Sequence, residues 1–479
     1  MLVGMTPRGT KRHCNTPIAS SSKRRNVTTP CSCVSSEDEV EDVLQSKKSA
    51  AAHLDSPPRV LPPGPRSVVQ MFKWPEFILR KACAQLGPVT VHDLLDNLNL
   101  HVSTAFSGMG CPEIAIEMIK AHVCSLGPDF AKIGMCINYG MCLDKNRECR
   151  TVLLENLPGR CVFKDILDFV EKGKNMKTWK LRSQCSCALH ENDCDLMPSD
   201  AASGCAKVMI AGPPCTPWSK RGKRQGNNDP QAQTHLIWAS FVLREKFDIV
   251  IFECVYDPEV LQNVTKFFGE CYHIEHAKVS AERLGFFVSR VRLYVIMMRK
   301  QAYTWTSSNT LQDEVDNLAR SVAMTTHDAF FMTPYELKEF DGCWDTEKGM
   351  EDNLSAAELR FLGDCTKSKQ SKTIYDLSQN PKFSATCELK AGVLPNLTTN
   401  CGSLFSTLAG RTLQWPELLV VQGVPATPCA SSAAGVKQWL FPVSRSAKVR
   451  MAGNGMHVPS VGSIVLLAML YAQPVGSTV

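Results

Sequence analysis

Short, almost wholly apolar runs follow one another from about residue 100 and are separated by stretches of helical periodicity. The runs that predict strands are HVSTAF (101–106), GMCINYGMCLD (134–144), KVMIAG (207–212), FDIVIFEC (247–254) and RLYVIMMR (292–299). Segments such as EIAIEMIKAHV (113–123) and THLIWASFVLREK (234–246) place apolar residues at the spacing of a helix face. Apolar strands that alternate with helices are typical of a parallel sheet covered on both faces, so we expect an α/β fold.

The same pattern divides the chain into four stretches. Residues 1–66 hold serine clusters, 8 of the 28 prolines and almost no apolar periodicity, which predicts a disordered tail, first basic and then acidic. Residues 67–300 carry the strand and helix alternation. Residues 301–405 lose it and become polar, which indicates an insert or a second domain. Residues 406–479 end in VPSVGSIVLLAMLYA, an apolar helix that we expect to pack on the sheet.

Composition excludes several classes of protein. Apolar residues make up 44% of the chain, and 53 Lys and Arg against 47 Asp and Glu give a net charge of +6, which excludes a wholly disordered or fibrous protein. The 22 cysteines are too few for a disulfide scaffold, and the first residues lack the apolar stretch of a secretory signal. The apolar run IVLLAMLYA is shorter than the ~20 residues that span a bilayer. We expect a soluble intracellular protein with reduced thiols and no membrane association.

A cysteine on a stiff turn is the sharpest chemical signal. KVMIAG leads to the carboxyl edge of the sheet, where open α/β folds bind ligands, and GPPCTPWS (212–219) follows it. Two prolines precede Cys215, and four cations follow shortly after it: Lys220, Arg221, Lys223 and Arg224. Nearby cations favour the nucleophilic thiolate and can also hold a phosphate backbone. The alternative, a buried and inert cysteine, is disfavoured by the prolines and the cations.

Three further segments place polar residues at the ends of predicted strands. FSGMG (106–110) is a glycine turn whose backbone can approach a ligand, although such turns also occur with nothing bound. Glu253 ends an apolar strand, where it can share a proton with a ligand or simply reach solvent. Arg290 and Arg292 are two residues apart, so we expect both on one face of the strand that begins there, where two guanidiniums suit a carbonyl and a phosphate.

Taken in chain order, these motifs carry a resemblance. FSGMG, GPPC, FEC, RVR, ELLVVQGVP and GNGMHVPSVG resemble the motif series of the DNA (cytosine-5) methyltransferases, over roughly residues 100–300 and 395–475. The resemblance implies a Rossmann-like, S-adenosylmethionine-dependent methyltransferase sheet with a smaller target-recognition domain over residues 301–405. It also implies transfer of a methyl group to carbon 5 of cytosine in DNA.

The resemblance implies a binding site for the cofactor S-adenosylmethionine. The matching positions are Phe106, Gly108, Gly110, Asp144, Asp165, Pro214 and Asn454. Phe106 would stack on adenine, Asp165 would bind the adenine amino group, and Asn454 would return to the cofactor pocket. The ribose-binding glutamate of the family has no counterpart, because the matching position is Cys142, and Asp144 stands nearby.

The catalytic positions implied by the resemblance are Cys215, Glu253, Arg290 and Arg292. Cys215 would attack carbon 6 of cytosine, and Glu253 would hydrogen-bond ring nitrogen 3. Arg292 would hold the base carbonyl, with Arg290 supporting the cysteine loop or a phosphate. Thiolate addition makes carbon 5 nucleophilic enough to take a methyl group, and the base must leave the helical stack to be reached.

Three neighbours of these residues depart from the pattern of the family. Thr216 follows the Pro-Cys pair where the family usually has glutamine. Cys254 follows the glutamate where the family usually has asparagine, and Val288 stands in place of a usual glutamine. A thiol is a weaker hydrogen-bonding group than an amide, so we expect slow but real turnover.

One cluster of Cys and His residues has zinc-like ligand types. Cys185, Cys187, His190 and Cys194 lie in CSCALHENDC, a cramped spacing for a tetrahedral site. We therefore interpret the segment as a polar loop before the catalytic strand and assign no metal site.

Two alternatives to DNA methylation stay open. Some members of the resembled family modify transfer RNA, and a methyltransferase-like protein could also bind nucleic acid without turnover. The basic cluster Lys23–Arg25 is consistent with a nuclear-import signal, a nucleic-acid arm or a solvated linker. We expect the protein in the nucleus, with DNA or, alternatively, transfer RNA as its partner; the sequence does not indicate an oligomeric state.

Overall fold

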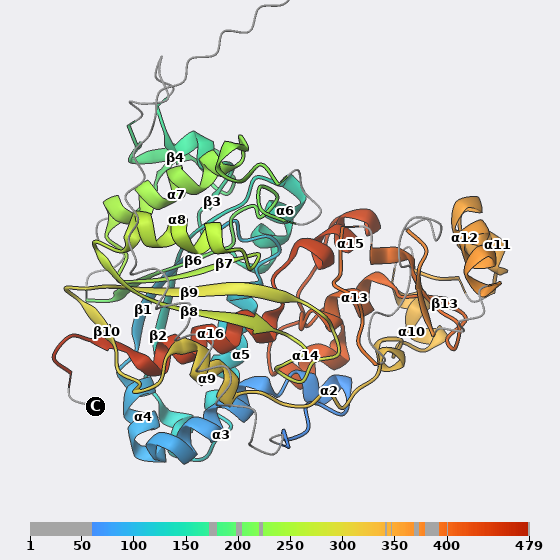
Figure 1. The fold of residues 1–479 in the computed structure, drawn as a ribbon, viewed down its shortest axis with the longest axis horizontal. Helices are drawn as coiled ribbons and strands as arrows, with labels where there is room; N and C mark the ends of the chain where they lie inside the picture. Colours follow the sequence, from blue (N-terminus) through green and yellow to red (C-terminus); the bar gives the residue numbers. More distant parts are fainter. Residues whose placement is uncertain are drawn as a thin grey trace, which may run out of the picture. The chain divides into compact units, whose positions relative to one another are not determined.

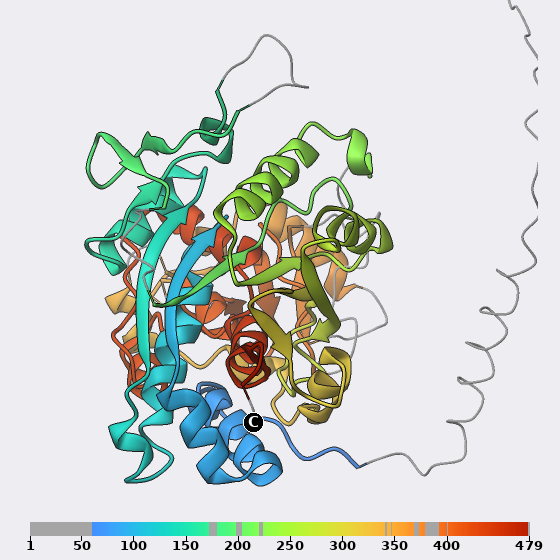
Figure 2. The same cartoon turned by 90° about the vertical axis from the view of Figure 1, so that its left-hand side faces the viewer.

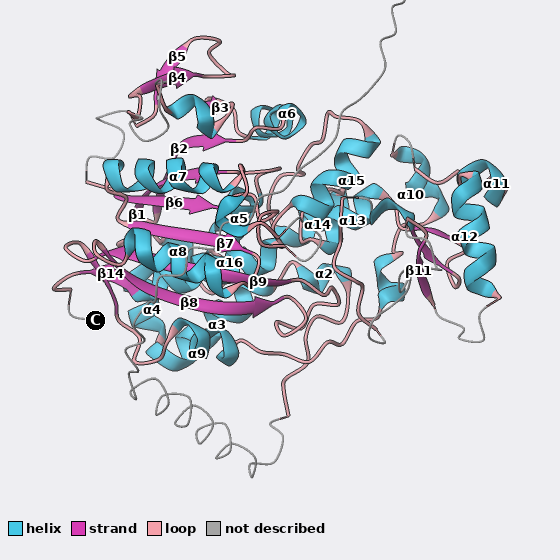
Figure 3. Ribbon diagram, turned by 45° about the horizontal axis from the view of Figure 1, so that its top comes forward, coloured by secondary structure: helices cyan, strands magenta, loops and turns pink. Residues whose placement is uncertain are grey.

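Seven strands form the central sheet, in the order β3-β2-β1-β6-β7-β9-β8 (Figure 3). Their bounds are β1 (Asn99–Ala105), β2 (Cys136–Leu143), β3 (Val162–Phe163), β6 (Ala206–Ala211), β7 (Ile249–Cys254), β8 (Tyr272–Ser280) and β9 (Val291–Arg299). The structure is a computed structural model that describes residues 60–171, 180–197, 204–219, 224–340, 343–345, 347–367, 373–378, 392–399 and 401–477. Each of the five strands predicted from apolar runs is present, and the expected α/β fold is confirmed.

The sheet is not parallel throughout. β1, β2, β3, β6 and β7 pair in parallel with one another, but β9 runs antiparallel to both β7 and β8. Residues 281–290 join β8 to β9 without a helix, and a connection of that length is too short for a parallel crossover. The two strands therefore form a hairpin, and β9 lies between β7 and β8.

Alternating side chains of the strands enter two separate cores. In β7, Ile249 and Ile251 belong to one core, whereas Val250 and Phe252 belong to the other. The first core also takes side chains from α3 (Trp74–Leu86), α4 (Pro88–Asp96), α5 (Cys111–Val123) and α16 (Val458–Tyr471). The second takes side chains from α7 (Ala232–Glu245) and α8 (Pro258–Phe268). Figures 1 and 2 show these two groups of helices on opposite faces of the sheet, as the apolar strands predicted.

The helix α16 is buried along its whole length. All of its residues are buried, which confirms the apolar helix expected to pack on the sheet. It contacts α5, α3 and β9, and the chain then continues into β14 (Ala472–Pro474), which pairs with β10 (Tyr303–Trp305). No single helix in the described part of the chain is long and apolar enough to cross a membrane, and α15 (Arg445–Asn454) with α16 passes that test only as a pair bent by 46°.

Residues 301–405 contribute to two different hydrophobic cores. Helix α9 (Leu311–Asn317) lies against β8, where the Leu311 N–H donates to Glu275 at 3.0 Å, and it contributes to the first core. A separate small core is built from Leu354, Leu362, Cys365, Tyr375, Leu377 and Phe405. Its elements include α12 (Ala356–Thr366) and the three-stranded sheet of β11 (Ile374–Asp376), β12 (Leu404–Ser406) and β13 (Arg411–Thr412).

The remaining helices and one hairpin complete the described structure. The helices are α2 (Val68–Met71), α6 (Arg147–Asn156), α10 (Pro334–Glu339), α11 (Met350–Asn353), α13 (Trp415–Val421) and α14 (Pro428–Ala434). The 3-10 helices are η1 (Phe130–Lys132), η2 (Ile166–Phe169), η3 (Gly226–Asn228), η4 (Thr326–Ala329) and η5 (Cys401–Ser403). A hairpin of β4 (Gln184–Ser186) and β5 (Asp193–Asp195) lies beside β3.

A buried ion pair joins β1, β2 and α5. The Arg160 guanidinium lies 2.7 Å from the Glu113 carboxylate, and the two side chains are 3% and 0% exposed. Arg160 also donates to the backbone carbonyls of Gly140 and Met141, both at 2.7 Å, and of Val102 at 3.2 Å. The pairing of β1 with β2 shifts register between Val102 and Thr104, so this guanidinium bonds carbonyls where the ladder is irregular.

We expect Arg160→Met to lower the free energy of unfolding by about 3–5 kcal/mol, because it leaves a buried carboxylate and three carbonyls without their partner. Urea denaturation of the full chain measures this loss. The matched control is Arg80→Met, which removes an exposed pair with Glu76 and should cost about 0–1 kcal/mol. Equal losses in the two variants would contradict the structural role of the buried pair.

Candidate active site

The carboxyl ends of five parallel strands meet at one edge of the sheet. The glycine turn follows β1, Asp144 follows β2, Asp165 follows β3, the Pro-Cys turn follows β6, and Glu253 lies at the end of β7. This edge is where open α/β sheets bind ligands. The fold therefore brings together motifs that are widely separated in the sequence.

The turn after β1 has an unusual backbone. Phe106, Gly108 and Gly110 have φ values of 56°, 56° and 92°, in the left-handed region that favours glycine. The Gly108 N–H donates to Asp144 at 2.8 Å, which ties the turn to the end of β2. A Cβ added at Gly108 would meet no atom within 4 Å, so the backbone faces open space there.

The two acidic residues of this edge have different environments. Asp144 accepts from the N–H groups of Gly108 and Asn146, and burial raises the pKa of its carboxyl above the ordinary value. Asp165 caps η2 by accepting from the Leu167 N–H at 3.0 Å and pairs with Lys145 at 3.1 Å. Asp144, and not Asp165, is therefore the acidic residue that contacts the glycine turn after β1.

These residues fit the cofactor implied by the family resemblance. Helix α5 begins at Gly110 without a side-chain cap, so its amino-terminal N–H groups and dipole suit the carboxylate of a methionine moiety. Carboxylates such as Asp144 and Asp165 can accept hydrogen bonds from ribose hydroxyls and an adenine amino group. Asn454 is exposed at the end of α15, and its neighbour Gly455 packs against Met109 of the turn, where a Cβ would lie 2.5 Å from the Met109 methyl carbon.

Cys215 lies on a turn that is fixed from several directions. Its carbonyl accepts from the N–H groups of Trp218 and Ser219, at 3.1 and 2.9 Å. The preceding carbonyl, of Pro214, accepts from Nε2 of His235 at 3.0 Å. Burial lowers the pKa of His235 to about 4, so its ring stays neutral and donates this bond steadily near neutral pH. No motif in the sequence points to His235, which lies on α7 and contacts the turn only in the folded structure.

Glu253 and Arg292 form an ion pair beside this cysteine. Arg292 Nε lies 3.0 Å from a Glu253 carboxylate oxygen, and the side chains are 15% and 11% exposed. A Cβ at Gly212 would lie 3.2 Å from the other Glu253 carboxylate oxygen, so the glycine before the prolines allows a close approach of the carboxylate. The pair can present both an acceptor and a donor to a planar polar ligand.

Arg290 and Arg292 have different partners. It lies just before β9, is buried, and donates to the Gly453 carbonyl at 3.3 Å and to Asn396 at 3.4 Å. Burial lowers the pKa of its guanidinium to about 10, which still leaves it charged near neutral pH. Arg290 therefore connects the start of β9 to the end of α15, whereas Arg292 pairs with Glu253.

The charges around Cys215 oppose one another. Burial is the largest effect and raises the pKa of the thiol, and the Glu253 carboxylate raises it further. Arg292 and Arg290 lower it, but the net shift is upward. The resting cysteine is therefore a neutral thiol near neutral pH.

The three residues that differ from the family pattern each contact neighbouring residues in the structure. Thr216 hydrogen-bonds the side chain of Gln231, Cys254 is buried in the second core, and Val288 is buried and pairs with Leu394. Of the basic loop, Arg224 is exposed, whereas Lys220, Arg221 and Lys223 lie outside the described residues, as does the Lys23–Arg25 cluster.

The group of zinc-like ligands contains Cys161 in place of Cys185, which the sequence motif had suggested. The ligand atoms of Cys161, Cys187, His190 and Cys194 lie within 4.8 Å of one another. Cys185 is not among them, since its thiol points to the Asp168 carbonyl at 3.2 Å. Cys161 was missed because it lies far upstream of the motif and reaches it only through the position of β3.

This chain was compared with solved structures and with curated protein sequences. Three solved structures are similar in fold: the Entamoeba histolytica methyltransferase EhMeth (13% identity, TM-score 0.44, covering 78% of this chain and 98% of that one), Spodoptera frugiperda DNMT2 (14%, 0.43, 77% and 98%) and S. pombe Dnmt2 methyltransferase (13%, 0.43, 77% and 98%). No curated protein sequence shows a significant match.

A family model provides the assignment. The model described as C-5 cytosine-specific DNA methylase matches residues 169–466, more than half of the chain, and the matched range includes Cys215, Glu253 and Arg292. The chain belongs to the C-5 cytosine-specific DNA methylase family.

Proposed function

We propose that this protein transfers a methyl group from S-adenosylmethionine to carbon 5 of cytosine in DNA, through a covalent adduct on Cys215. The observation that carries the proposal is the grouping of Cys215 with the Glu253–Arg292 pair at the carboxyl edge of the sheet, next to the glycine turn. Membership of the family supports a cytosine base as the substrate.

Each side chain has a defined task in this reaction. The Cys215 sulfur adds to carbon 6, and Glu253 hydrogen-bonds ring nitrogen 3 as charge develops on the ring. Arg292 donates to the base carbonyl, and Arg290 and His235 hold the segments that carry the reacting groups. S-adenosylmethionine, when bound, supplies the electrophilic methyl group. As the sulfur adds, the thiol proton passes through Glu253 to ring nitrogen 3. After methyl transfer, water takes the proton from carbon 5, the bond between sulfur and carbon 6 breaks, and the proton on nitrogen 3 returns through Glu253 to the sulfur.

The reaction requires the cytosine outside the base stack. Carbon 6 of a paired base is inaccessible to a half-buried thiol, so the target nucleotide must be flipped or already single-stranded. Duplex DNA is the proposed polymer and the nucleus the proposed compartment. Transfer RNA is the second candidate, and binding without turnover is the third.

One assay separates these candidates. The full chain is incubated with tritiated S-adenosylmethionine and either duplex DNA or transfer RNA, with Cys215→Ala as the matched control. We expect transfer of label to DNA by the wild type alone. Label on transfer RNA but not on DNA would support the second candidate, and binding without label on either polymer would support the third.

The covalent step predicts a trapped complex. DNA that carries 5-fluorocytosine should form an adduct with the wild type that survives denaturation, because fluorine cannot leave carbon 5 as the proton does. Cys215→Ser should abolish the adduct, and Cys271→Ser, at an exposed thiol away from the edge, should preserve it. Mass spectrometry locates the adduct, and trapping by the Cys215→Ser protein would refute this nucleophile.

The charges around Cys215 predict the pH dependence of its reactivity. Since the pKa of the thiol is raised, the rate of its alkylation by iodoacetamide should rise about tenfold per pH unit across neutral and mildly alkaline pH. Glu253→Gln removes a carboxylate that raises this pKa, so its profile should shift to lower pH. Arg292→Gln removes a cation that lowers it, so its profile should shift to higher pH. Shifts in the same direction would contradict the assignment of these opposing effects.

A further inference from the structure

A hairpin beside the sheet has little hydrophobic core of its own. Of residues 180–197, only Cys185, Cys187 and Leu196 are buried, and β4 and β5 pair over three residues each. An isolated two-stranded hairpin is at best marginally stable in water. Its backbone meets β3 through the β-bridge between Phe163 and Cys187 and a bond from the Ala188 N–H to the Val162 carbonyl at 2.7 Å, and residues 180–182 bond the backbone of residues 169–171.

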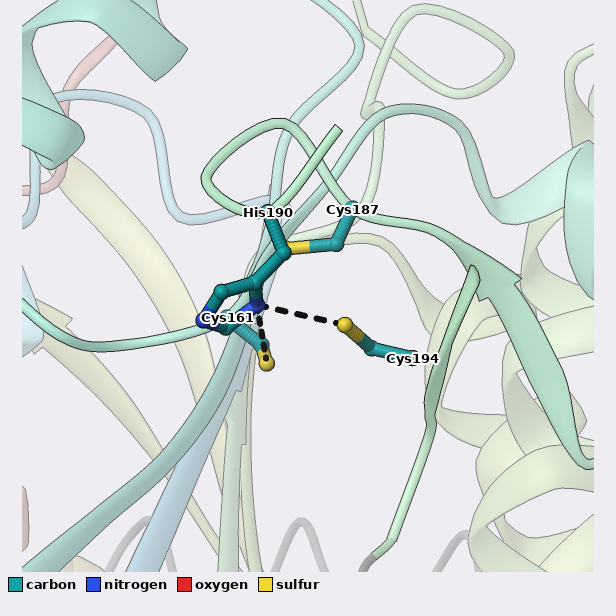
Figure 4. A group of neighbouring side chains, drawn as sticks. All are labelled: Cys161, Cys187, His190 and Cys194. Atoms are coloured by element: carbon teal, nitrogen blue, oxygen red, sulfur yellow. Dashed lines mark hydrogen bonds between the residues drawn. The ribbon is translucent and has the colours of Figure 1, made fainter. Parts of the chain in front are cut away.

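Four soft ligand atoms converge where this hairpin meets β3. Cys161 lies at the entry to β3, Cys187 and His190 lie in the connection between β4 and β5, and Cys194 lies on β5 (Figure 4). Cys187 is fully buried, and Cys161 and Cys194 are partly buried. In Figure 4, dashed lines join Nδ1 of His190 to the sulfur atoms of Cys161 and Cys194, and the Cys187 side chain lies beside the histidine.

The distances suit a tetrahedral metal site. Nδ1 of His190 lies 3.6 Å from the Cys161 sulfur and 3.2 Å from the Cys194 sulfur. Tetrahedral zinc, with Zn–S near 2.3 Å and Zn–N near 2.0–2.1 Å, places sulfur and nitrogen ligands about 3.6 Å apart. Three thiolates and one imidazole form a common ligand set of structural zinc sites.

The backbone also holds the loop that carries two of the four ligands, Cys187 and His190. The Cys187 N–H donates to the Asn192 carbonyl at 2.8 Å and closes the loop that presents His190. Such outer contacts fix the orientation of metal ligands.

We propose that Cys161, Cys187, His190 and Cys194 bind one structural zinc ion that fastens the β4–β5 hairpin to the edge strand β3. The four ligands come from two segments of chain, so the ion closes the loop between them and supplies the stabilisation that a small exposed hairpin lacks. The ion lies away from the part of the carboxyl edge of the sheet where Cys215 and Glu253 lie, and takes no part in methyl transfer.

Metal content is the direct test. The full chain is purified without chelators or a polyhistidine tag, and zinc is measured by inductively coupled plasma mass spectrometry. We expect about one zinc per chain in the wild type and a loss of at least several-fold in Cys161→Ser and Cys194→Ser. Cys185→Ser, at a cysteine directly opposite Cys194 in the hairpin, is the matched control and should retain the metal. Equal loss in this control, or a wild type without zinc, would overturn the proposal.

Cobalt gives a second test that does not depend on the folding of a variant. Wild-type protein reconstituted with Co²⁺ should show the visible bands of tetrahedral cobalt and the near-ultraviolet bands of cobalt bound to thiolate. Cys194→His, which keeps four ligands, should retain cobalt with weaker thiolate bands. Octahedral cobalt spectra would overturn the proposal, and so would a disulfide between two of these cysteines in protein purified under reducing conditions.

A local readout tests the fastening role. Removal of zinc by a chelator should speed tryptic cleavage after Lys180 and Arg182, the exposed basic residues that lead into β4, several-fold more than cleavage at sites elsewhere. Unchanged cleavage there would contradict the fastening of the hairpin. These measurements use no cofactor or nucleic acid, so their outcome is independent of the proposed methyl transfer.

Discussion

The buried guanidinium of Arg160 positions the glycine turn at the carboxyl edge of the sheet. Where the pairing of β1 and β2 is irregular, backbone carbonyls need a donor, and Arg160 provides it. The charge of Arg160 in turn requires Glu113, which fixes the first turn of α5. Glu113 also accepts from the Thr104 hydroxyl, which contacts Ser107 of the glycine turn. The position of the turn thus depends on one buried ion pair.

The elements that the sequence predicted correctly are the buried ones, because burial requires a regular pattern of apolar residues. The five apolar strands and the helices α5, α7 and α16 are buried, so their periodicity is visible. The edge strand β8, with the sequence YHIEHAKVS, alternates exposed and buried residues and was missed, and with it the antiparallel hairpin. Cys215 and Glu253 were found because their motifs are contiguous. His235 and Cys161 were not, because they join their sites only through tertiary contacts.

Two opposite charges beside Cys215 act on the ionisation of its thiol. Glu253 opposes ionisation of Cys215 and at the same time pairs with Arg292. Under the proposed function, a base that engages Glu253 and Arg292 changes both influences on the sulfur at once. The thiolate would then form in the presence of substrate, and a resting thiol would be less exposed to oxidation.

The burial of α16 also constrains how the protein folds during synthesis. Its residues complete the core against α3, α5 and the sheet, yet they come more than 300 residues after α5 in the chain. Contacts of such long sequence separation form late and slowly. The apolar faces of α3 and α5 stay uncovered until residue 471 has left the ribosome, which makes the nascent chain a natural client for chaperones.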